Sequence, residues 1–387
     1  MNKKNLIIFY IFSFLIGFYV ANGTTILFEQ RLGFSYSQIF DLGAVYMLMF
    51  IIFNVPAGAL ADIIGRKKTL IAGSLILVAA AITTGLSNTF LQVFLTFFLW
   101  SCGFCFIIGA DQALLYDVTK DDKQYAKDWG RASFFALIGT ALAGVVGPIL
   151  YSHNFRFPYL FTAIPFFLAG VVFLFFKEDR KEGKFSWADY KRNNLTGIKL
   201  AFQNKHVLWA TGVLALVFGA MYSLTNSYQP YLVNVGFKVK AFSLILPAMF
   251  LLEASGGAMA GKLYEKWGDK AVFIYGLVGN ALCLLVLGLF ARQFAVTFLF
   301  GYYLLQGIIN PVTSAYTNRH ISGDLRATII SAQTMTATFA AAIMLFIFGA
   351  LTDKVGLNNL LIILGGMVLV FGVILLLIKP KEDQLNV

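Results

Sequence analysis

Residues Gly58–Lys68 read GALADIIGRKK and form a short polar turn between two long apolar runs. Apolar runs on both sides of a brief polar segment are typical of two membrane-spanning helices joined by a tight loop. Gly65 permits a tight turn, and Gly58 allows two helices to approach closely. Asp62 lies where a carboxylate can cap the N-terminus of a neighbouring helix. The segment therefore predicts a helical hairpin in a membrane.

Apolar runs of spanning length continue on both sides of this turn. A spanning helix needs about 20 apolar residues. Such runs occur at 6–28, 37–60, 68–87, 89–117, 131–151, 157–176, 207–233, 241–263, 271–290, 294–317, 327–350 and 358–378. The chain is 59% hydrophobic and only 13% charged, whereas a soluble domain carries about 25% charged residues. The sequence therefore predicts an all-α membrane protein with twelve transmembrane helices.

The basic residues are distributed unevenly between the two sides of the membrane. With the N-terminus inside, the outer side holds six of the 30 lysines and arginines, namely Arg31, Arg156, Lys238, Lys240, Arg292 and Lys354. Cytoplasmic loops normally carry the excess of Lys and Arg, so we expect both termini in the cytoplasm. The same asymmetry explains the net charge of +11 without a nucleic acid partner.

The chain consists of two related halves. The segment 261–270, GKLYEKWGDK, repeats the Gly, Leu, acid and Gly of Gly58–Lys68 at matching spacing. We expect a six-helix bundle at 1–176, a cytoplasmic linker at 177–206 and a second six-helix bundle at 207–387. A short surface helix is expected within the linker, at 195–202. Duplicated halves of this kind are common in secondary transporters.

The turn resembles the signature loop of the major facilitator superfamily, G-x-L-A-D-R-x-G-R-K. The matching residues are Gly58, Leu60, Ala61, Asp62, Gly65, Arg66 and Lys67, while Ile63 replaces a basic residue. The resemblance implies the major facilitator fold of two pseudo-symmetric halves, and it favours a bacterial, drug-efflux-like member. It also implies that the loop is a cytoplasmic latch in which Asp62 meets the N-terminus of the eleventh span, near Arg326. Alternatively, the loop only orients the topology.

Two ion pairs are expected beside the repeated turns. Arg66 can pair with Asp117 at the cytoplasmic end of the fourth span. In the second half the charges are reversed, because Asp269 stands where Arg66 stands and Arg319 takes the place of Asp117. Together with Gly58, Asp62, Gly65 and Glu265, these residues are the predicted gating set.

Acidic residues at membrane depth are candidates for proton coupling, because a charge there costs about 2.5–3.5 kcal/mol even on insertion scales. Glu253 lies near the middle of the eighth span, and Asp111 lies in the inner half of the fourth. A carboxyl group can exchange a proton for a bound cation. Alternatively, Glu253 bonds to a neighbouring helix and Asp111 belongs to the cytoplasmic charge cluster. Glu29 is expected at the outer interface.

The family resemblance implies that the first, fourth, seventh and tenth spans line the substrate cavity. The candidate substrate-binding residues there are Asn22, Trp100, Tyr222, Asn226, Tyr228, Gln229, Gln306 and Asn310. Such a lining suits a partly apolar ligand that makes a few hydrogen bonds. No Lys or Arg lies at mid-depth in these spans, which argues against strongly anionic substrates.

Several functions fit these observations. Acidic residues without basic residues at mid-membrane depth favour a proton-coupled exporter of lipophilic or cationic compounds. The alternative is a proton-coupled or facilitative uptake carrier for a neutral nutrient. A non-transporting membrane sensor is the alternative from another class. The three histidines, His153, His206 and His320, lie far apart, and no catalytic or nucleotide-binding motif is visible. We therefore expect no enzyme, cofactor or metal, but a monomeric carrier in a bacterial cytoplasmic membrane.

Overall fold

The structure is a computed structural model. It describes residues 3–119, 121–178, 199, 201–321 and 326–381, and the regular elements in this part of the chain are all helices. The surface helix expected at 195–202 falls mostly outside the described residues.

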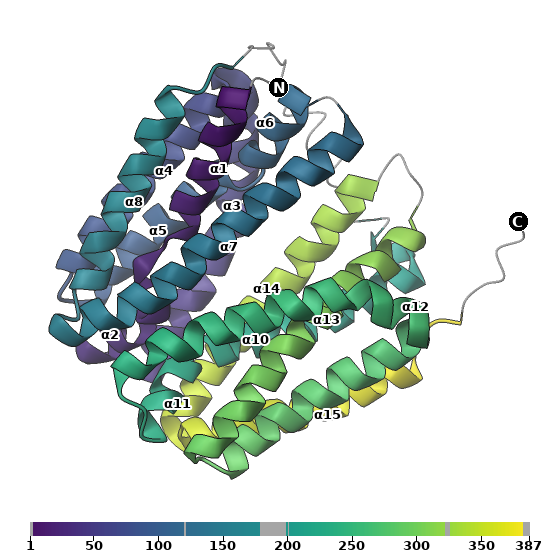
Figure 1. The fold of residues 1–387 in the computed structure, drawn as a ribbon. Helices are drawn as coiled ribbons and strands as arrows, with labels where there is room; N and C mark the ends of the chain where they lie inside the picture. Colours follow the sequence, from purple (N-terminus) through teal and green to yellow (C-terminus); the bar gives the residue numbers. More distant parts are fainter. Residues whose placement is uncertain (1–2, 120, 179–198, 200, 322–325, 382–387) are drawn as a thin grey trace, which may run out of the picture. The chain divides into compact units, whose positions relative to one another are not determined.

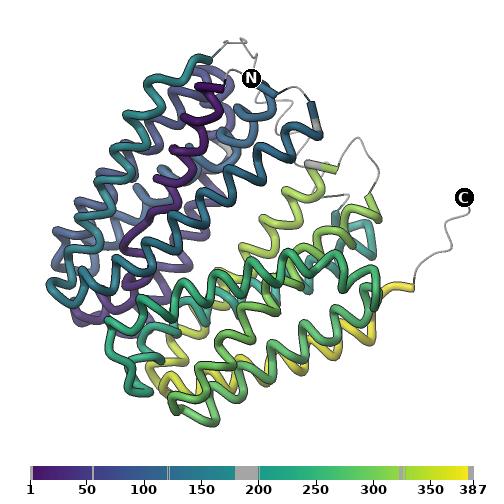
Figure 2. Tube along the Cα trace, in the orientation of Figure 1, coloured from purple at the N-terminus to yellow at the C-terminus, as the bar shows by residue number. Residues whose placement is uncertain are grey.

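The helices of the first half follow the order of the predicted spans (Figure 1). They are α1 (Lys3–Gly17), η1 (Val20–Gly23), α2 (Thr25–Arg31), α3 (Tyr36–Ile64), α4 (Arg66–Leu86), α5 (Phe90–Ile107), α6 (Ala110–Thr119), α7 (Asp122–His153) and α8 (Phe157–Leu174). The path of the chain can be followed as a continuous trace in Figure 2.

The helices of the second half also follow the order of the predicted spans. They are α10 (Lys205–Thr225), α11 (Tyr228–Asn234), η2 (Val239–Ala241), α12 (Phe242–Leu289), η3 (Gln293–Ala295), α13 (Val296–Arg319), α14 (Arg326–Val355) and α15 (Leu357–Leu377).

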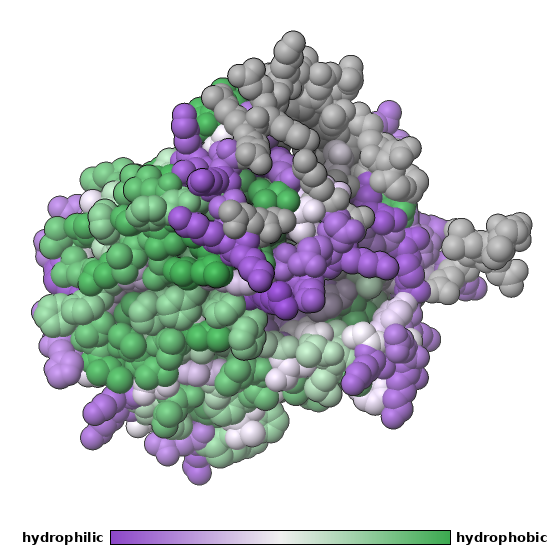
Figure 3. All heavy atoms as spheres, turned by 45° about the horizontal axis from the view of Figure 1, so that its top comes forward, coloured by the Kyte–Doolittle hydropathy of each residue, from purple (hydrophilic) through white to green (hydrophobic). Residues whose placement is uncertain are grey.

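The described residues contain 11 helical segments that are long and apolar enough to cross a membrane. One of them, Val239–Leu289, has 51 residues and includes both the eighth and the ninth predicted span. Within it, Gly268 has a non-helical backbone, with φ 71° and ψ 168°. All twelve predicted spans are therefore present, and the predicted fold class is confirmed. Hydrophobic side chains cover a broad area of the surface, and hydrophilic side chains lie mainly beside it, with smaller groups along its outer edge (Figure 3).

The chain forms two compact units. Unit 1 comprises Met1–Phe185 and Phe237–Pro247, and unit 2 comprises Ser186–Gly236 and Ala248–Val387. The domain limits at 176 and 207 stay a prediction.

The two units pair their helices in the same way. In unit 1, α1 packs against α7, and α4 packs against α8. In unit 2, α10 packs against α14, and a Cβ atom at Gly365 of α15 would lie 2.8 Å from the backbone nitrogen of Leu285 in α12. The first span thus meets the fifth, and the third meets the sixth, in both units. This repetition supports the duplication that the sequence predicts.

The two repeated turns are made by glycines with positive φ. Gly65 has φ 95° and Gly268 has φ 71°, a region that side chains with a Cβ atom rarely enter. The predicted tight turn at Gly65 is therefore confirmed. Gly58 lies on the exposed face of α3, and no heavy atom lies within 4 Å of a Cβ placed there. The close helix approach expected at Gly58 stays a prediction.

Three spans that the sequence predicts as continuous helices are interrupted. The first breaks between Gly17 and Thr25, the fourth at Ile108–Gly109 and the seventh at Asn226–Ser227. In the first break, the hydroxyl of Thr162 accepts a hydrogen bond from the backbone N–H of Ala21 at 3.0 Å. Breaks at membrane depth are tolerated where other groups satisfy the freed backbone, and they often mark transporter binding sites.

Candidate functional site

Unit 2 contains buried polar side-chain atoms that have no hydrogen-bond partner in the protein. They are the hydroxyls of Tyr231 and Tyr302, both amide atoms of Asn280 and Gln306, and Oδ1 of Asn310. Among the described residues of unit 1, one oxygen of Glu29 has the same property. Buried polar groups are normally paired, so each exception needs an explanation such as water or a ligand.

Helix α13 places three of these side chains on one face. Tyr302, Gln306 and Asn310 follow each other at intervals of four residues, which aligns them along the helix. Tyr302 and Gln306 are each 1% exposed. The stripe therefore points into unit 2 and supplies hydroxyl and amide groups over about two helical turns.

Glu253 of α12 lies against this stripe. A Cβ atom at Gly307 of α13 would overlap the backbone carbonyl of Glu253, so the two helices touch there through their backbones. The carboxyl group of Glu253 interacts electrostatically with Tyr302 and Tyr303. Gly307 thus brings the predicted proton-coupling acid beside the unpaired groups of α13.

The seventh span also contributes side chains to this group. The amide of Gln229 donates to the hydroxyl of Tyr228 at 3.2 Å, and Tyr228 interacts electrostatically with Tyr303. We call the seven residues Tyr228, Gln229, Glu253, Tyr302, Tyr303, Gln306 and Asn310 the polar cluster. Four of the predicted substrate-binding residues belong to it, and two others, Tyr222 and Asn226, precede it at the end of α10.

The two predicted substrate-binding residues of unit 1 lie in different settings. Trp100 is 4% exposed, its indole N–H donates to the hydroxyl of Thr84 at 3.0 Å, and its ring lies 4.9 Å from that of Tyr19. This packing explains Trp100 without a ligand. Asn22 is exposed in the broken part of the first span. Their roles in substrate binding stay predictions.

Asp111 lies at the break in the fourth span. Its Oδ1 accepts hydrogen bonds from the backbone N–H groups of Gly109, at 3.1 Å, and Gln112, at 2.7 Å. Gly109 has φ 93°, so the carboxylate secures a turn at the beginning of α6. This contact gives Asp111 a structural role beside its predicted proton coupling.

Glu29 does not lie at an exposed interface as expected. It is 2% exposed in α2 and interacts electrostatically with Tyr19 and Tyr159. Tyr19 of the same span and Tyr159 of the sixth span lie around this carboxyl group, so Glu29 is buried within unit 1.

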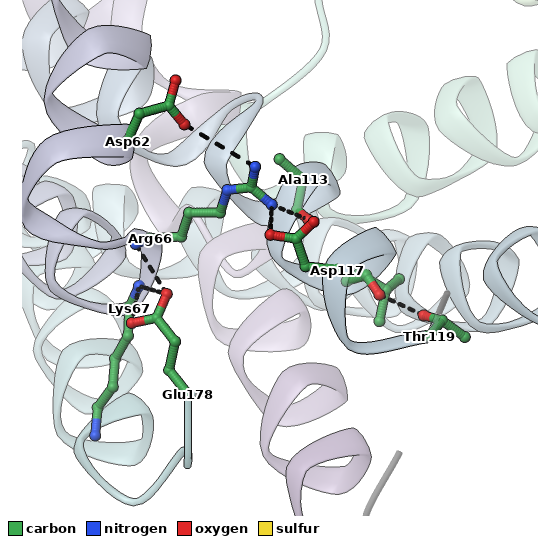
Figure 4. Close-up of polar contacts among 8 residues, drawn as sticks. Asp62, Arg66, Lys67, Ala113, Asp117, Thr119 and Glu178 are labelled. Carbon is green, nitrogen blue, oxygen red and sulfur yellow. Dashed lines mark hydrogen bonds and ion pairs between the residues drawn. The ribbon is translucent and has the colours of Figure 1, made fainter. Parts of the chain in front are cut away.

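Arg66 forms the centre of an ionic group at the predicted cytoplasmic end of unit 1 (Figure 4). Its guanidinium group pairs with Asp117, donates to the carbonyl of Ala113 and lies 4.0 Å from Asp62. The predicted ion pair with Asp117 is therefore present. It ties the beginning of α4 to α6 within one unit, while the contact of Asp62 with the eleventh span stays a prediction.

Glu178, which was not predicted from the sequence, completes this group. Its carboxylate accepts hydrogen bonds from the backbone N–H groups of Arg66, at 3.0 Å, and Lys67, at 3.3 Å. Carboxylates at helix N-termini are favourable because the N–H groups there lack partners within the helix. An acid directly after the sixth span was the only signal in the sequence.

A second missed acid is Asp128 of α7, which is 1% exposed. It accepts hydrogen bonds from the hydroxyl of Tyr10, at 3.0 Å, and the amide of Gln124, at 2.8 Å. Arg131 lies 3.7 Å away. The network joins α1 to α7 near the predicted cytoplasmic end.

The reversed ion pair of unit 2 is also present, with an additional cation. Asp269 lies 3.5 Å from Arg319 and 2.8 Å from Lys379, just beyond α15. Burial by itself raises the pKa of Asp269, but the hydrogen bond from Lys379 and the charges of Lys379 and Arg319 outweigh it and lower that pKa below its ordinary value. Glu265 is exposed on α12. Gating by these residues stays a prediction.

The interrupted apolar spans, the duplicated turns and the buried polar cluster together define a multi-pass membrane transporter. The family model of the Major Facilitator Superfamily matches residues 6–259 and 212–387. The chain therefore belongs to this family, and it is a transporter rather than an enzyme.

Two curated relatives and one solved structure resemble this chain over much of its length. The chain is 22% identical to the uncharacterized MFS-type transporter YxaM of Bacillus subtilis (strain 168), over 97% of this chain and 96% of YxaM. It is 25% identical to the cis,cis-muconate transport protein of Acinetobacter baylyi, over 64% of this chain and 61% of that protein. The crystal structure of the nucleoside transporter NupG aligns with a TM-score of 0.81 at 15% identity, over 99% of this chain and 100% of NupG. This last likeness shows the fold alone.

Proposed function

We propose that this carrier transports a small neutral solute rich in hydrogen-bonding groups, coupled to protons, by alternating access. The observation that carries the proposal is the stripe of buried, unpaired hydroxyl and amide atoms on α13, from Tyr302, Gln306 and Asn310. Leaving such groups unpaired costs about 1–3 kcal/mol each. A solute that supplies complementary donors and acceptors recovers this cost, whereas a purely apolar solute does not.

The charge of the lining favours a neutral solute over an anionic one. The polar cluster contains one acid and no base, so a dicarboxylate such as muconate would meet no cation there. The polar cluster therefore does not favour the substrate of the Acinetobacter relative. The substrate of NupG, a nucleoside, has the neutral hydrogen-bonding character that the cluster suits.

Glu253 is the proposed proton site. It is the only acid of the polar cluster, and it lies beside Tyr302 and Tyr303. A carboxyl group in this position can take up a proton while the solute occupies the neighbouring amides and hydroxyls. Proton and solute would then move together, and the carrier would work as an uptake symporter.

A second candidate is proton-coupled export of lipophilic or cationic compounds. The same acid without a neighbouring base favours it, because a cation can replace the proton on Glu253. Aromatic rings of the polar cluster can also hold a cation. The two candidates differ in whether the solute and the proton move in the same or opposite directions.

Purified protein in liposomes that contain a pH-sensitive dye would test the proposal. We would add nucleosides, dipeptides and lipophilic cations to the outside and compare the parent with Glu253→Gln and Gln306→Leu. We expect a neutral solute to acidify the interior. Gln306→Leu should weaken the apparent affinity about tenfold. Glu253→Gln should retain solute exchange but lose the pH change.

The matched control is Asp353→Asn, which removes an exposed acid at the end of α14 and should behave like the parent. Alkalinisation of the interior by lipophilic cations, without a response to any neutral solute, would favour the export candidate. Equal solute affinity of Gln306→Leu and the parent would contradict binding at the polar cluster.

A further inference from the structure

Three lysines lie exposed around the turn at Gly268 in unit 2. They are Lys262, Lys266 and Lys270, and no ion pair among the described residues includes any of them. Positive charge that the protein does not neutralise attracts anions from outside. The turn of unit 2 therefore presents three ammonium groups to its surroundings.

The acids of the same segment do not cancel this charge. Asp269 already pairs with Arg319 and Lys379. Glu265 is exposed on α12, and it is one acid against three lysines. The surface of the turn is therefore positively charged.

The repeated turn of unit 1 uses its basic residues within the protein instead. Arg66 pairs with Asp117, and the ammonium group of Lys67 donates to the backbone carbonyl of Leu174 at 2.7 Å. The segment from Gly58 to Lys68 also contains no aromatic residue. The two turns repeat the same motif, but only the turn of unit 2 combines several exposed lysines with aromatic side chains.

Two exposed aromatic side chains accompany the lysines of unit 2. Trp267 is 48% exposed and Tyr275 is 62% exposed, and their ring centroids lie 5.6 Å apart. The ammonium group of Lys266 lies 6.0 Å from the centroid of the Trp267 ring. Exposed tryptophan and tyrosine gather where lipid headgroups meet the hydrocarbon, because each ring has an apolar body and a polar tip.

The face of α12 that carries Tyr275 continues as an apolar row. Leu282 and Leu289 follow Tyr275 at intervals of seven residues, which places them on the same face of the helix, and both are exposed. Exposed leucines on a membrane-spanning helix face lipid chains. The aromatic pair therefore lies at the end of a lipid-facing row, at the level where the lysines begin.

We propose that the turn at Gly268 binds the headgroup of an anionic phospholipid. Lys262, Lys266 and Lys270 attract its phosphate, while Trp267 and Tyr275 hold the boundary between headgroup and acyl chains. Basic residues at a membrane surface favour anionic over neutral lipids. The site is separate from the polar cluster, and it does not depend on the proposed function.

Quenching of Trp267 fluorescence by brominated lipids tests the site without a transported solute. The protein would be placed in phosphatidylcholine liposomes with either brominated phosphatidylglycerol or brominated phosphatidylcholine, at equal mole fraction. The difference from Trp267→Phe isolates the emission of Trp267, and bromine quenches an indole only at close range. We expect stronger quenching by phosphatidylglycerol, and equal quenching by the two lipids would overturn the proposal.

The role of the lysines has its own variant. Changing Lys262, Lys266 and Lys270 together to Gln should lower the preference for phosphatidylglycerol about fivefold. High salt should weaken the preference of the parent, because it screens the charges. An unchanged preference in the triple variant would overturn binding by these lysines.

The matched control removes the same charge from exposed positions of unit 1, with Lys68→Gln, Lys123→Gln and Lys127→Gln. It should keep the preference of the parent, and an equal loss there would show that net charge rather than this turn attracts the lipid. Because all six lysines are exposed, both triple variants should melt at the temperature of the parent. Soluble glycerol phosphate should leave the quenching unchanged, and abolition of the preference by it would show a site for free phosphate instead of a lipid.

Discussion

The carboxylate of Glu178 stabilises the beginning of α4 from a position more than a hundred residues further along the chain. It accepts two backbone hydrogen bonds there. We predict that Glu178→Gln lowers the free energy of unfolding by about 1 kcal/mol, because the amide loses the charge that the helix N-terminus favours. Chemical unfolding in detergent micelles would measure the change. Glu265→Gln, an exposed site on α12, is the matched control, and an equal loss there would contradict the capping role.

At the residue scale, the ion pairs beside the repeated turns could be predicted from the sequence. Contacts between side chains that meet from distant helices could not. The pairs Arg66–Asp117 and Asp269–Arg319 were predicted because the duplicated turns fix their positions relative to the spans. Lys379 as a third member was not, because its position depends on how the end of α15 packs. Glu29 was misplaced for the same reason. Hydropathy indicates where Glu29 lies along its helix, but it does not show which side chains from other helices surround it.

The contact between α1 and α7 depends on glycines. A Cβ atom at Gly139 of α7 would overlap the backbone carbonyl of Phe14. In the corresponding contact of unit 2, between α10 and α14, one at Gly219 of α10 would meet only the flexible side chain of Met344. We predict that Gly139→Ala destabilises the protein by about 1–3 kcal/mol, because the backbones must move apart. Gly219→Ala should cost clearly less. Melting temperatures of the two variants would decide, and equal losses would contradict the packing difference.

The two ion pairs should respond differently to an exchange of charges. In unit 1, the double variant Arg66→Asp with Asp117→Arg should recover part of the stability and transport that each single change removes, through a coupling of about 1 kcal/mol. In unit 2, Asp269→Arg with Arg319→Asp should not recover, because the new arginine at position 269 would face Lys379.

Adding Lys379→Glu to the exchanged pair of unit 2 provides the test of this explanation. The triple variant should regain stability that the double variant lacks. Equal recovery by exchange in both units, without any change at Lys379, would show that Lys379 does not matter to the pair.

At the scale of whole helices, the number and order of spans followed from the sequence, because each needs a run of apolar residues that few other structures contain. The interruptions at 18–24, 108–109 and 226–227 did not. Each contains glycine or polar residues, such as Asn22, Gly109 and Asn226, but similar residues also lie inside unbroken helices, such as Asn280 in α12. The freed backbone groups are satisfied by distant side chains such as Thr162. Hydropathy indicates whether a segment can lie in a membrane, but it does not show where the helix is interrupted.

For the whole molecule, the positive-inside asymmetry predicts that the repeated turns face the cytoplasm. We propose the bacterial cytoplasmic membrane as the location, with both termini inside. Single cysteines at Lys67 and Lys270, in a variant without Cys102, Cys105 and Cys283, should react with a membrane-impermeant maleimide only in inside-out vesicles. A single cysteine at Arg156 should react only in right-side-out vesicles. Labelling of Lys67 and Lys270 from opposite sides would contradict an even number of spans between them.

The anchoring of Lys379 has a practical consequence for handling the protein. The last apolar helix, α15, ends at Leu377, and an expression plasmid designed from hydropathy would place a purification tag or a stop codon directly after it. That truncation would remove the ammonium group that holds Asp269, and it would leave a half-buried acid with one cation instead of two. Tags and fusion partners therefore belong beyond Lys381, and a poor yield from a shorter chain would reflect a lost ion pair rather than an unsuitable membrane segment.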